Sequence, residues 1–150
     1  MNILVSVDLS DASNQVIEAA RGIADLTGAS IYVLHVIESD PEVIVYGKKP
    51  EVTQDRIAKK FPLEHKGVST LAAKLQDEGL DAEPWLALGP GVAATLKEAE
   101  ALEVGLIVVG THGHGAVYDV LIGSYSAGLI RKSKLPVLVV PIPRPRKNQS

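Results

Sequence analysis

The amino-acid sequence predicts an α/β fold, an open and doubly wound sheet of five parallel strands with helices on both faces. Short, nearly continuous apolar runs alternate with segments whose apolar residues recur at helical spacing. Runs of the first kind are typical of strands that helices cover on both faces. A closed eight-stranded barrel of such units needs about 250 residues, whereas this chain has 150. An open sheet is therefore expected.

The first part of the chain predicts a βαβ unit. Residues 3–7 and 31–37 are the two expected strands, and apolar residues recur at helical spacing between them. Ser10 and Ser13 are candidate N-caps of this helix, and Gly28 is its expected C-terminal stop. Two such strands separated by one helix are expected to pair in parallel through a right-handed crossover.

The middle of the chain predicts a surface loop, a helix and an edge strand. From residue 38 to about residue 53 the periodicity gives way to acids, prolines and a glycine, which is typical of a variable loop. Pro62 starts or kinks the next helix, which Gly79 ends. Residues 82–88 read as the third strand, and Pro84 places it at an edge because proline has no N–H to donate.

The last part of the chain supplies two further strands, at residues 106–109 and 137–140, with a helix before the first and another between them at about 124–132. In open α/β sheets, ligands bind beyond the carboxyl ends of the strands, where the strand order reverses. Asp8 follows the first strand and Gly110 follows the fourth. We therefore expect the functional site near these two residues.

The amino-acid composition and net charge exclude several kinds of site and disfavour others as functions of this chain. The chain has no cysteine, which excludes disulfides and thiolate metal sites and is typical of a reducing compartment. A net charge of −3 offers no general attraction to nucleic acid. We see no signal peptide and no apolar run long enough for a membrane span, so we expect a cytoplasmic protein without membrane contact. Residues 1–141 are expected to form one domain, followed by a Pro-rich basic tail at 142–150.

A glycine-punctuated segment follows the fourth strand. It begins at Gly110, continues through Gly113, and reaches Gly123 and Ser124 at the start of a helix. Glycines let backbone N–H groups approach a ligand, and a helix N-terminus attracts anions. Phosphate binding and a purely structural role, in which Gly110 ends a strand and Ser124 caps a helix, both fit these residues.

The spacing of this segment is Gly, two residues, Gly, nine residues, Gly-Ser, and a strand at 137–140 follows it. Together with ILVSVD at residues 3–8, VLHV at 33–36 and LIVVGTHG at 106–113, it covers nearly the whole chain. In these motifs the chain resembles the universal stress protein family, in its ATP-binding subgroup. The resemblance implies the strand order 3-2-1-4-5, a homodimer formed through residues 137–140, and ATP, ADP or AMP as ligand, with Mg²⁺ as a candidate companion ion.

The resemblance also assigns roles to individual residues. Asp8 matches the family acid beside the adenosine, and Val36 matches the residue whose backbone contacts adenine. Val109 and Gly110 match positions that flank the ribose. Tyr125 contributes its backbone but stands where the family usually has a small aliphatic residue. The positions that match the phosphate-contacting set are Gly113, Gly123, Ser124 and Ser126.

Three functions remain open at this point. The first is a nucleotide-binding regulator in the stress response, which needs no catalysis and acts through unidentified protein partners. The second is slow, metal-dependent ATP hydrolysis in the same pocket, with Asp8 or a histidine orienting the metal or water. The third is a partner-binding module whose pocket is blocked by Tyr125 or by the 38–53 loop. Neither a Walker lysine motif nor a G-x-S-x-G elbow is present in the sequence, and a metal site at His112 and His114 lacks a third defined ligand.

Overall fold

The computed structural model describes residues 1–38, 53–111 and 122–143. It contains a sheet in which all pairings are parallel and the strand order is β3-β2-β1-β4-β5, which confirms the predicted fold class and order. The elements are, in chain order, β1 (Asn2–Ser6), α1 (Ser13–Thr27), β2 (Ser30–Ile37), α2 (Gln54–Lys60), α3 (Pro62–Asp77), β3 (Ala82–Leu88), α4 (Gly91–Ala101), β4 (Val104–Gly110), α5 (Ser124–Lys132) and β5 (Val137–Val140).

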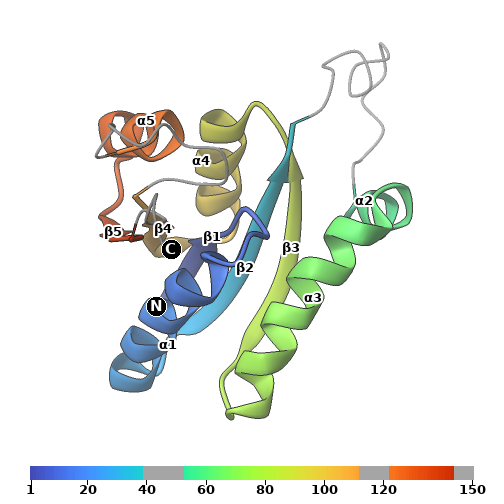
Figure 1. Cartoon of the computed structure of the whole chain (residues 1–150), viewed down its shortest axis with the longest axis horizontal. Helices are drawn as coiled ribbons and strands as arrows, with labels where there is room; N and C mark the ends of the chain where they lie inside the picture. Colours follow the sequence, from blue (N-terminus) through green and yellow to red (C-terminus); the bar gives the residue numbers. More distant parts are fainter. Residues whose placement is uncertain (39–52, 112–121, 144–150) are drawn as a thin grey trace, which may run out of the picture.

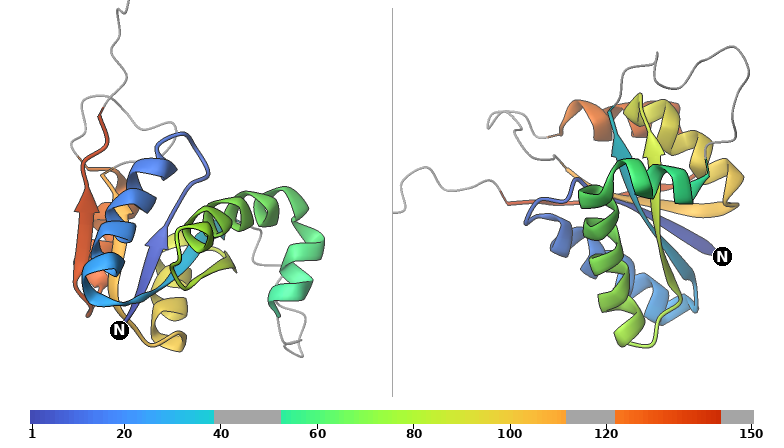
Figure 2. Two further views of the ribbon diagram at one scale, coloured as in Figure 1. Left: turned by 90° about the horizontal axis from the view of Figure 1, so that it is seen from below. Right: turned by 90° about the vertical axis from the view of Figure 1, so that its right-hand side faces the viewer.

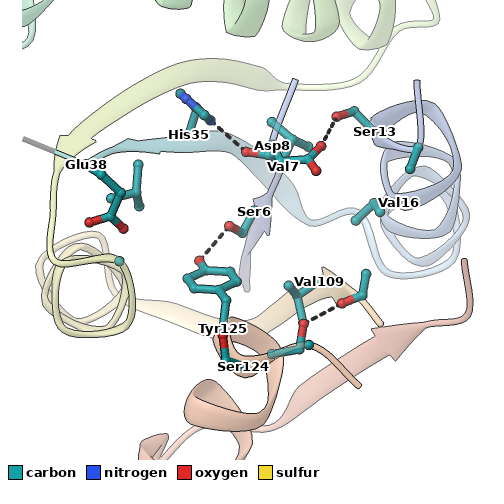
Figure 3. A pocket seen from close by; sticks show the side chains of 16 residues that line it. Ser6, Val7, Asp8, Ser13, Val16, His35, Glu38, Val109, Ser124 and Tyr125 are labelled. Carbon is teal, nitrogen blue, oxygen red and sulfur yellow. Dashed lines mark hydrogen bonds between the residues drawn. The ribbon is translucent and has the colours of Figure 1, made fainter. Parts of the chain in front are cut away.

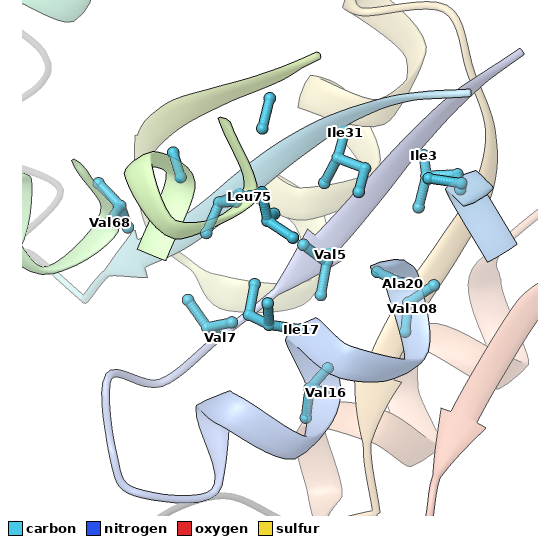
Figure 4. Packing of buried hydrophobic residues seen from close by; sticks show 14 of the residues in the cluster. Ile3, Val5, Val7, Val16, Ile17, Ala20, Ile31, Val68, Leu75 and Val108 are labelled. Carbon is cyan, nitrogen blue, oxygen red and sulfur yellow. The ribbon is translucent and has the colours of Figure 1, made fainter. Parts of the chain in front are cut away.

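Helices cover both faces of the sheet (Figure 1). On one face α1 buries Val16, Ile17 and Ala20 against strand residues such as Val5 and Val108 (Figure 4), and α3 joins the same cluster through its own apolar residues. On the other face α4 and α5 pack on a second apolar cluster. Figure 2 shows α2 and α3 on the β3 side of the molecule, far from β5. Two separate cores therefore hold a sheet that is apolar on both faces, as a parallel sheet must be.

The residues that the structure describes contain one helix more than the sequence predicts. Four helices are predicted, but α2 precedes α3 as a fifth. Its apolar pattern is too short to read, since Ile57 is its one buried residue. Thr53 starts it by accepting a hydrogen bond from the Arg56 N–H, and Pro62 occupies the first turn of α3. The prediction that Pro62 starts a helix is therefore confirmed, and the missing helix is the one just before it.

The predicted N-caps of α1 are wrong. The N-cap position is Ala12, and no side chain caps this end of the helix. The hydroxyls of Ser10 and Ser13 donate to Asp8 instead. A carboxylate is a stronger acceptor than a neutral group, so it captures both serines. The other end follows the prediction, because Gly28 has the left-handed conformation expected of a C-terminal glycine, with a φ of 76°.

The outer edge of β3 is covered by side chains of the same chain. Alternate residues of a parallel strand direct their backbone groups to the same side, and Ile31 and Ile37 of β2 bond the backbone of residues 81 and 89. Residues 82, 84 and 86 therefore face outward. Gln76 donates to the carbonyl of residue 82, Pro84 has no N–H, and Gln54 both donates to the Leu86 carbonyl and accepts from its N–H. Pro84 thus lies at an edge, as predicted.

In the described ranges 1–38, 53–111 and 122–143, no helix is long and apolar enough to cross a membrane.

Candidate functional site

A cavity of about 410 Å³ opens at the carboxyl ends of β1, β2 and β4 (Figure 3). The order β3-β2-β1-β4-β5 reverses between β1 and β4, so the cavity lies at the switch point where ligands bind in such sheets. The residues that line it are Ser6, Val7, Asp8, Ala12, Ser13, Val16, His35, Val36, Glu38, Gly91, Val109, Gly110, Gly123, Ser124, Tyr125 and Ser126.

The cavity brings together the site residues predicted from the sequence. Eight of the nine line it, coming from the ends of three strands and the start of α5, and they are Asp8, Val36, Val109, Gly110, Gly123, Ser124, Tyr125 and Ser126. The ninth, Gly113, lies outside the described residues, as do His112 and His114.

Asp8 organises the turn between β1 and α1. One oxygen of its carboxylate, Oδ1, accepts from the Ser10 N–H at 2.9 Å, from the Ser10 hydroxyl at 2.6 Å and from the Ser13 hydroxyl at 3.3 Å. Leu9, the next residue, has a φ of 66°, in the left-handed region that non-glycine residues rarely adopt. The bonds to Asp8 hold this turn against its backbone strain, so the carboxylate has a structural role at the rim of the cavity.

The end of β2 presents backbone groups to the cavity. Pairing between β1 and β2 ends at Ser6 and Leu34, after which the Val7 N–H donates to the Leu34 carbonyl. Because alternate residues of a parallel strand face the same neighbour, the N–H and C=O of Val36 point to the side where β1 has already left the sheet. His35 Nδ1 lies 2.9 Å from the Val7 carbonyl. A carbonyl can only accept, so Nδ1 carries a proton.

The N-terminus of α5 supplies donors on the β4 side. Gly123 precedes the helix in an extended conformation, with a φ of −71° and a ψ of 162°, and its carbonyl accepts from the Ala127 N–H. The N–H groups of Ser124, Tyr125 and Ser126 have no partner within the helix. Together with the helix dipole they form a place where an anion is stabilised.

The two serines of this turn are not equivalent. Ser124 is exposed, whereas Ser126 is 2% exposed and its hydroxyl donates to the Gly110 carbonyl at 2.6 Å. A hydroxyl has one proton, so the Ser126 proton is engaged in joining α5 to β4. The Ser124 hydroxyl and the backbone N–H groups are the donors that this turn presents to a ligand.

Gly110 allows the chain to turn closely behind the cavity. A Cβ atom at this position would lie 3.0 Å from Ile142 Cγ1 and 3.3 Å from Val16 Cγ2. Next to it, the Thr111 N–H donates to the Val140 carbonyl, and the Gly123 N–H donates to the Thr111 carbonyl. Ile142 and Val16 therefore leave little space for a side chain at position 110, which lies beside the pocket.

A chain of hydroxyls joins three elements at the floor of the cavity. The Tyr125 phenol oxygen lies 2.6 Å from Ser6 Oγ and 2.7 Å from Thr95 Oγ1, and Thr95 donates to the Gly91 carbonyl at 2.8 Å. Since Thr95 gives its single proton to Gly91, Tyr125 must donate to Thr95, and Ser6 must donate to Tyr125. Proton donation along these hydroxyls therefore runs in one direction, from Ser6 on β1 through Tyr125 on α5 to Thr95 on α4.

The protonation of Tyr125 follows mainly from its burial. Burial raises the pKa of the phenol above its ordinary value of 10.0, the hydrogen bond with Ser6 opposes that rise, and the negative charge of Glu38 adds to it. The phenol is thus neutral at physiological pH, as donation to Thr95 requires.

Sequence reasoning missed the partners of Tyr125 and the acid at the cavity mouth. Ser6 and Thr95 were unremarkable as single residues, because their role depends on the strand order that brings β1, α4 and α5 together. Glu38 fell at the start of the predicted loop. The one available signal was Tyr125 itself, a large side chain where the family resemblance implies a small one.

A metal ion has few protein ligands here. Among the described residues, no group of three or more His, Cys, Asp or Glu side chains could hold one. Mg²⁺ keeps several waters and binds through one or two carboxylates and the phosphates of its ligand. A magnesium ion at this site would therefore depend on phosphate oxygens.

The fold and the pocket at the switch point define a class, the doubly wound α/β proteins with a ligand site at the carboxyl ends of the strands. Within that class the family model of the universal stress protein family matches residues 1–141. The chain is 31% identical over 140 residues to universal stress protein A homolog 1 of Coxiella burnetii (93% of this chain and 94% of that protein). It is 32% identical over 145 residues to universal stress protein YxiE of Bacillus subtilis, covering 92% and 97%. The chain belongs to the universal stress protein family.

Solved structures share the fold. MJ0577 of Methanocaldococcus jannaschii superposes with a TM-score of 0.75 at 24% identity, covering 96% of this chain and 98% of that one. A universal stress protein in complex with cAMP gives 0.68 at 25% identity, covering 93% and 96%. A universal stress protein of Archaeoglobus fulgidus in complex with dAMP gives 0.66 at 22% identity, covering 93% and 97%.

Proposed function

We propose that this chain binds an adenine nucleotide, with ATP as the physiological ligand, in the cavity between β1, β2, β4 and the N-terminus of α5. The observation that carries the proposal is the division of the cavity into two ends. The α5 turn offers backbone N–H groups to an anion. The β2 end offers the N–H and C=O of Val36, a donor and acceptor pair suited to the edge of a base.

The size of the cavity and the ligands of similar proteins support this proposal. A volume of about 410 Å³ is within the range of small-molecule sites. Two solved structures of the same fold hold cAMP and dAMP, both of which combine an adenine base with a phosphate. Ligands of this chemistry fit a pocket with a base end and an anion end.

In this proposal the protein is a cytoplasmic regulator of the stress response rather than an enzyme. It forms a homodimer through β5, whose Leu138 is 38% exposed on an edge strand. Nucleotide occupancy changes the interactions of the dimer with a protein partner. ATP carries Mg²⁺ on its phosphates, because the described residues supply few metal ligands.

The test is calorimetric titration of nucleotide-free protein with ATP, ADP and AMP, with and without Mg²⁺, in a matched pair of variants. Ser124→Ala removes the exposed hydroxyl. Ser124→Pro also removes the backbone N–H, and it suits the first helical position, where that N–H has no helical partner. The extended ψ of 162° at Gly123 is compatible with a following proline.

Ser124→Pro should bind ATP about tenfold more weakly than Ser124→Ala, which corresponds to one charge-assisted hydrogen bond. Circular dichroism of both variants shows whether α5 and the fold persist. If both variants fold and bind ATP with equal affinity, the Ser124 N–H at the α5 turn does not contact the nucleotide. Absence of binding of any of the three nucleotides to the wild type would overturn the proposed function.

A further inference from the structure

A second carboxylate, that of Glu38, lines the cavity just after the end of β2. Figure 3 shows Glu38 at one end of the pocket and Val16 at the other, with Ser6 and Tyr125 between them. The Glu38 side chain reaches the N-terminus of α4: a Cβ atom on Gly91 would lie 2.8 Å from its Oε1 and 3.3 Å from Tyr125 Cδ1. Glycine at position 91 therefore leaves room for the carboxylate against the pocket wall.

No hydrogen bond or ion pair joins the Glu38 carboxylate to another residue in the described part of the chain. Its charge is nevertheless felt in the pocket, because it raises the pKa of the Tyr125 phenol. Within the described residues, the carboxylate is thus an exposed acceptor at the cavity that no other side chain engages.

Charge determines which end of a ligand can lie near Glu38. Asp8 and Glu38 follow β1 and β2, whereas the N–H groups of α5 lie on the β4 side. An anion is repelled by the two carboxylates and attracted by the helix N-terminus. A nucleotide with its phosphate at α5 therefore extends its uncharged base toward β2 and Glu38.

The side chains at this end accept hydrogen bonds. Glu38 can only accept when ionised, and Ser6 has already given its proton to Tyr125, so its remaining capacity is as an acceptor. The Val36 carbonyl accepts as well. A base that meets these three groups must carry donors, and an exocyclic amino group has two N–H bonds to give.

We propose that the Glu38 carboxylate accepts a hydrogen bond from the 6-amino group of the bound purine and so makes the pocket select 6-aminopurine nucleotides. This inference rests on the proposed function and adds to it the side chain that distinguishes the base. Glu38 is a specificity-determining residue in this account, and Ser6 and Tyr125 hold the floor of the pocket in place beside it.

The experiment compares two ligands that differ in one group. AMP carries the 6-amino group, and purine riboside 5′-monophosphate lacks it but keeps the same ring nitrogens, ribose and phosphate. The ratio of their two dissociation constants is measured for the wild type, Glu38→Ala, Glu38→Gln and a control, Glu100→Gln. Glu100 is an exposed acid near the other end of α4.

Removing a negative charge near the site changes the affinity for both monophosphates together, so the ratio isolates the amino group. Glu38→Ala should reduce the preference for AMP about tenfold, as expected for a hydrogen bond to a charged acceptor. Glu38→Gln keeps a neutral acceptor and should lose less of the preference. Glu100→Gln should keep the wild-type ratio.

The outcomes separate this inference from the proposed function. If the wild type binds AMP and Glu38→Ala keeps the same ratio, nucleotide binding stands and the role of Glu38 is overturned. A residue that only complements the α4 N-terminus would lower the melting temperature of the ligand-free protein and leave the ratio unchanged. If neither ligand binds the wild type, both proposals fail.

Discussion

The Ser6 hydroxyl at the end of β1 lies 2.6 Å from the phenol oxygen of Tyr125 in the first turn of α5, although the two residues are 119 positions apart in the sequence. The contact closes the floor of the cavity between β1 and α5. Because Tyr125 passes its own proton to Thr95, the phenol connects β1 to α4 as well. Tyr125→Phe keeps the ring and deletes this connection.

Tyr125→Phe should therefore lower the free energy of unfolding by about 1–3 kcal/mol, since the Ser6 proton and the buried Thr95 oxygen both lose a partner. Urea denaturation followed by circular dichroism measures the change. Tyr32→Phe is the matched control, because its ring packs edge-on against Trp85 with the centroids 5.6 Å apart, a contact that phenylalanine retains. Equal stabilities of the two variants would mean that the hydroxyl chain contributes nothing.

The raised pKa of Tyr125 predicts a loss of stability at high pH. The unfolded chain ionises this tyrosine near pH 10.0, whereas burial keeps the folded phenol protonated to higher pH. Above that pH the unfolded state binds fewer protons than the folded state, so the free energy of unfolding falls as pH rises. Below it, the contribution of Tyr125 is complete.

Ultraviolet titration of tyrosinate in the wild type and in Tyr125→Phe measures this directly. The component missing from the variant should be the one that titrates at higher pH than an ordinary tyrosine. The alkaline fall in stability should also be shallower in the variant. A missing component that titrates at or below pH 10.0 would contradict the assignment.

Two variants of Asp8 distinguish its role in the stability of the β1–α1 turn from a role in ligand binding. Asp8→Asn keeps an Oδ1 acceptor for Ser10 and Ser13, so its stability should change by less than about 1 kcal/mol, whereas Asp8→Ala deletes the acceptor of three bonds and should cost about 1–3 kcal/mol. If Asp8 also contacts the nucleotide, Asp8→Asn should bind it more weakly while remaining nearly as stable as the wild type. Thermal unfolding and titration on the same samples test both; wild-type affinity in Asp8→Asn would leave the residue a structural role alone.

The proposed homodimer through β5 can be tested by a substitution on that strand. Leu138→Lys places a charge on the one residue of β5 classed as exposed, and it should shift a homodimer toward monomer by at least about tenfold in dissociation constant, since burying a lysine is costly. Sedimentation equilibrium measures the shift. Leu26→Lys, at an 89% exposed position on α1, serves as the comparison and should leave assembly unchanged. A dimer that tolerates Leu138→Lys would lie on another surface.

Substitution of Gln54 should affect the β3 edge locally and change the stability of the whole fold little. Gln54→Ala removes both bonds to Leu86 and should speed hydrogen exchange of the Leu86 amide, while amides of β1 in the centre of the sheet keep their protection. The cost in global stability should be about 1 kcal/mol. Exchange measured residue by residue by NMR provides the check, and an unchanged Leu86 rate would mean that the edge is protected by something other than Gln54.

The sequence was informative where one physical rule dominates. Apolar runs predicted the strands, and Pro84 predicted an edge because a missing N–H has one consequence in a sheet. Positions where two groups compete for the same side-chain hydroxyl were harder to predict. Ser10 and Ser13 are good helix caps in isolation, and only the folded turn shows that the Asp8 carboxylate takes both hydroxyls. The short helix α2 buries Ile57 alone, too little to produce a periodic pattern.

The candidate site was predictable to the extent that it depends on backbone. The glycines and the helix start gave its location, and eight of the predicted residues meet at one cavity. The side chains that shape its floor were not predictable, because Ser6, Thr95 and Tyr125 come from three elements that the strand order alone brings together. A hydroxyl chain of this kind leaves no trace in spacing or composition.

The two borders of the sheet differ, and the difference limits how copies of the chain can add to one another. Along β3, Gln76 occupies the carbonyl of residue 82, Pro84 has no N–H, and Gln54 occupies both backbone groups of Leu86, so few outward groups at positions 82, 84 and 86 are left for another strand. Growth of a continuous sheet from molecule to molecule needs both borders, and at the β3 border most of the outward hydrogen-bonding groups are already engaged or missing. An association that joins two β5 strands uses the same border twice and is finished at two copies, so pairing through β5 does not by itself continue into a fibre.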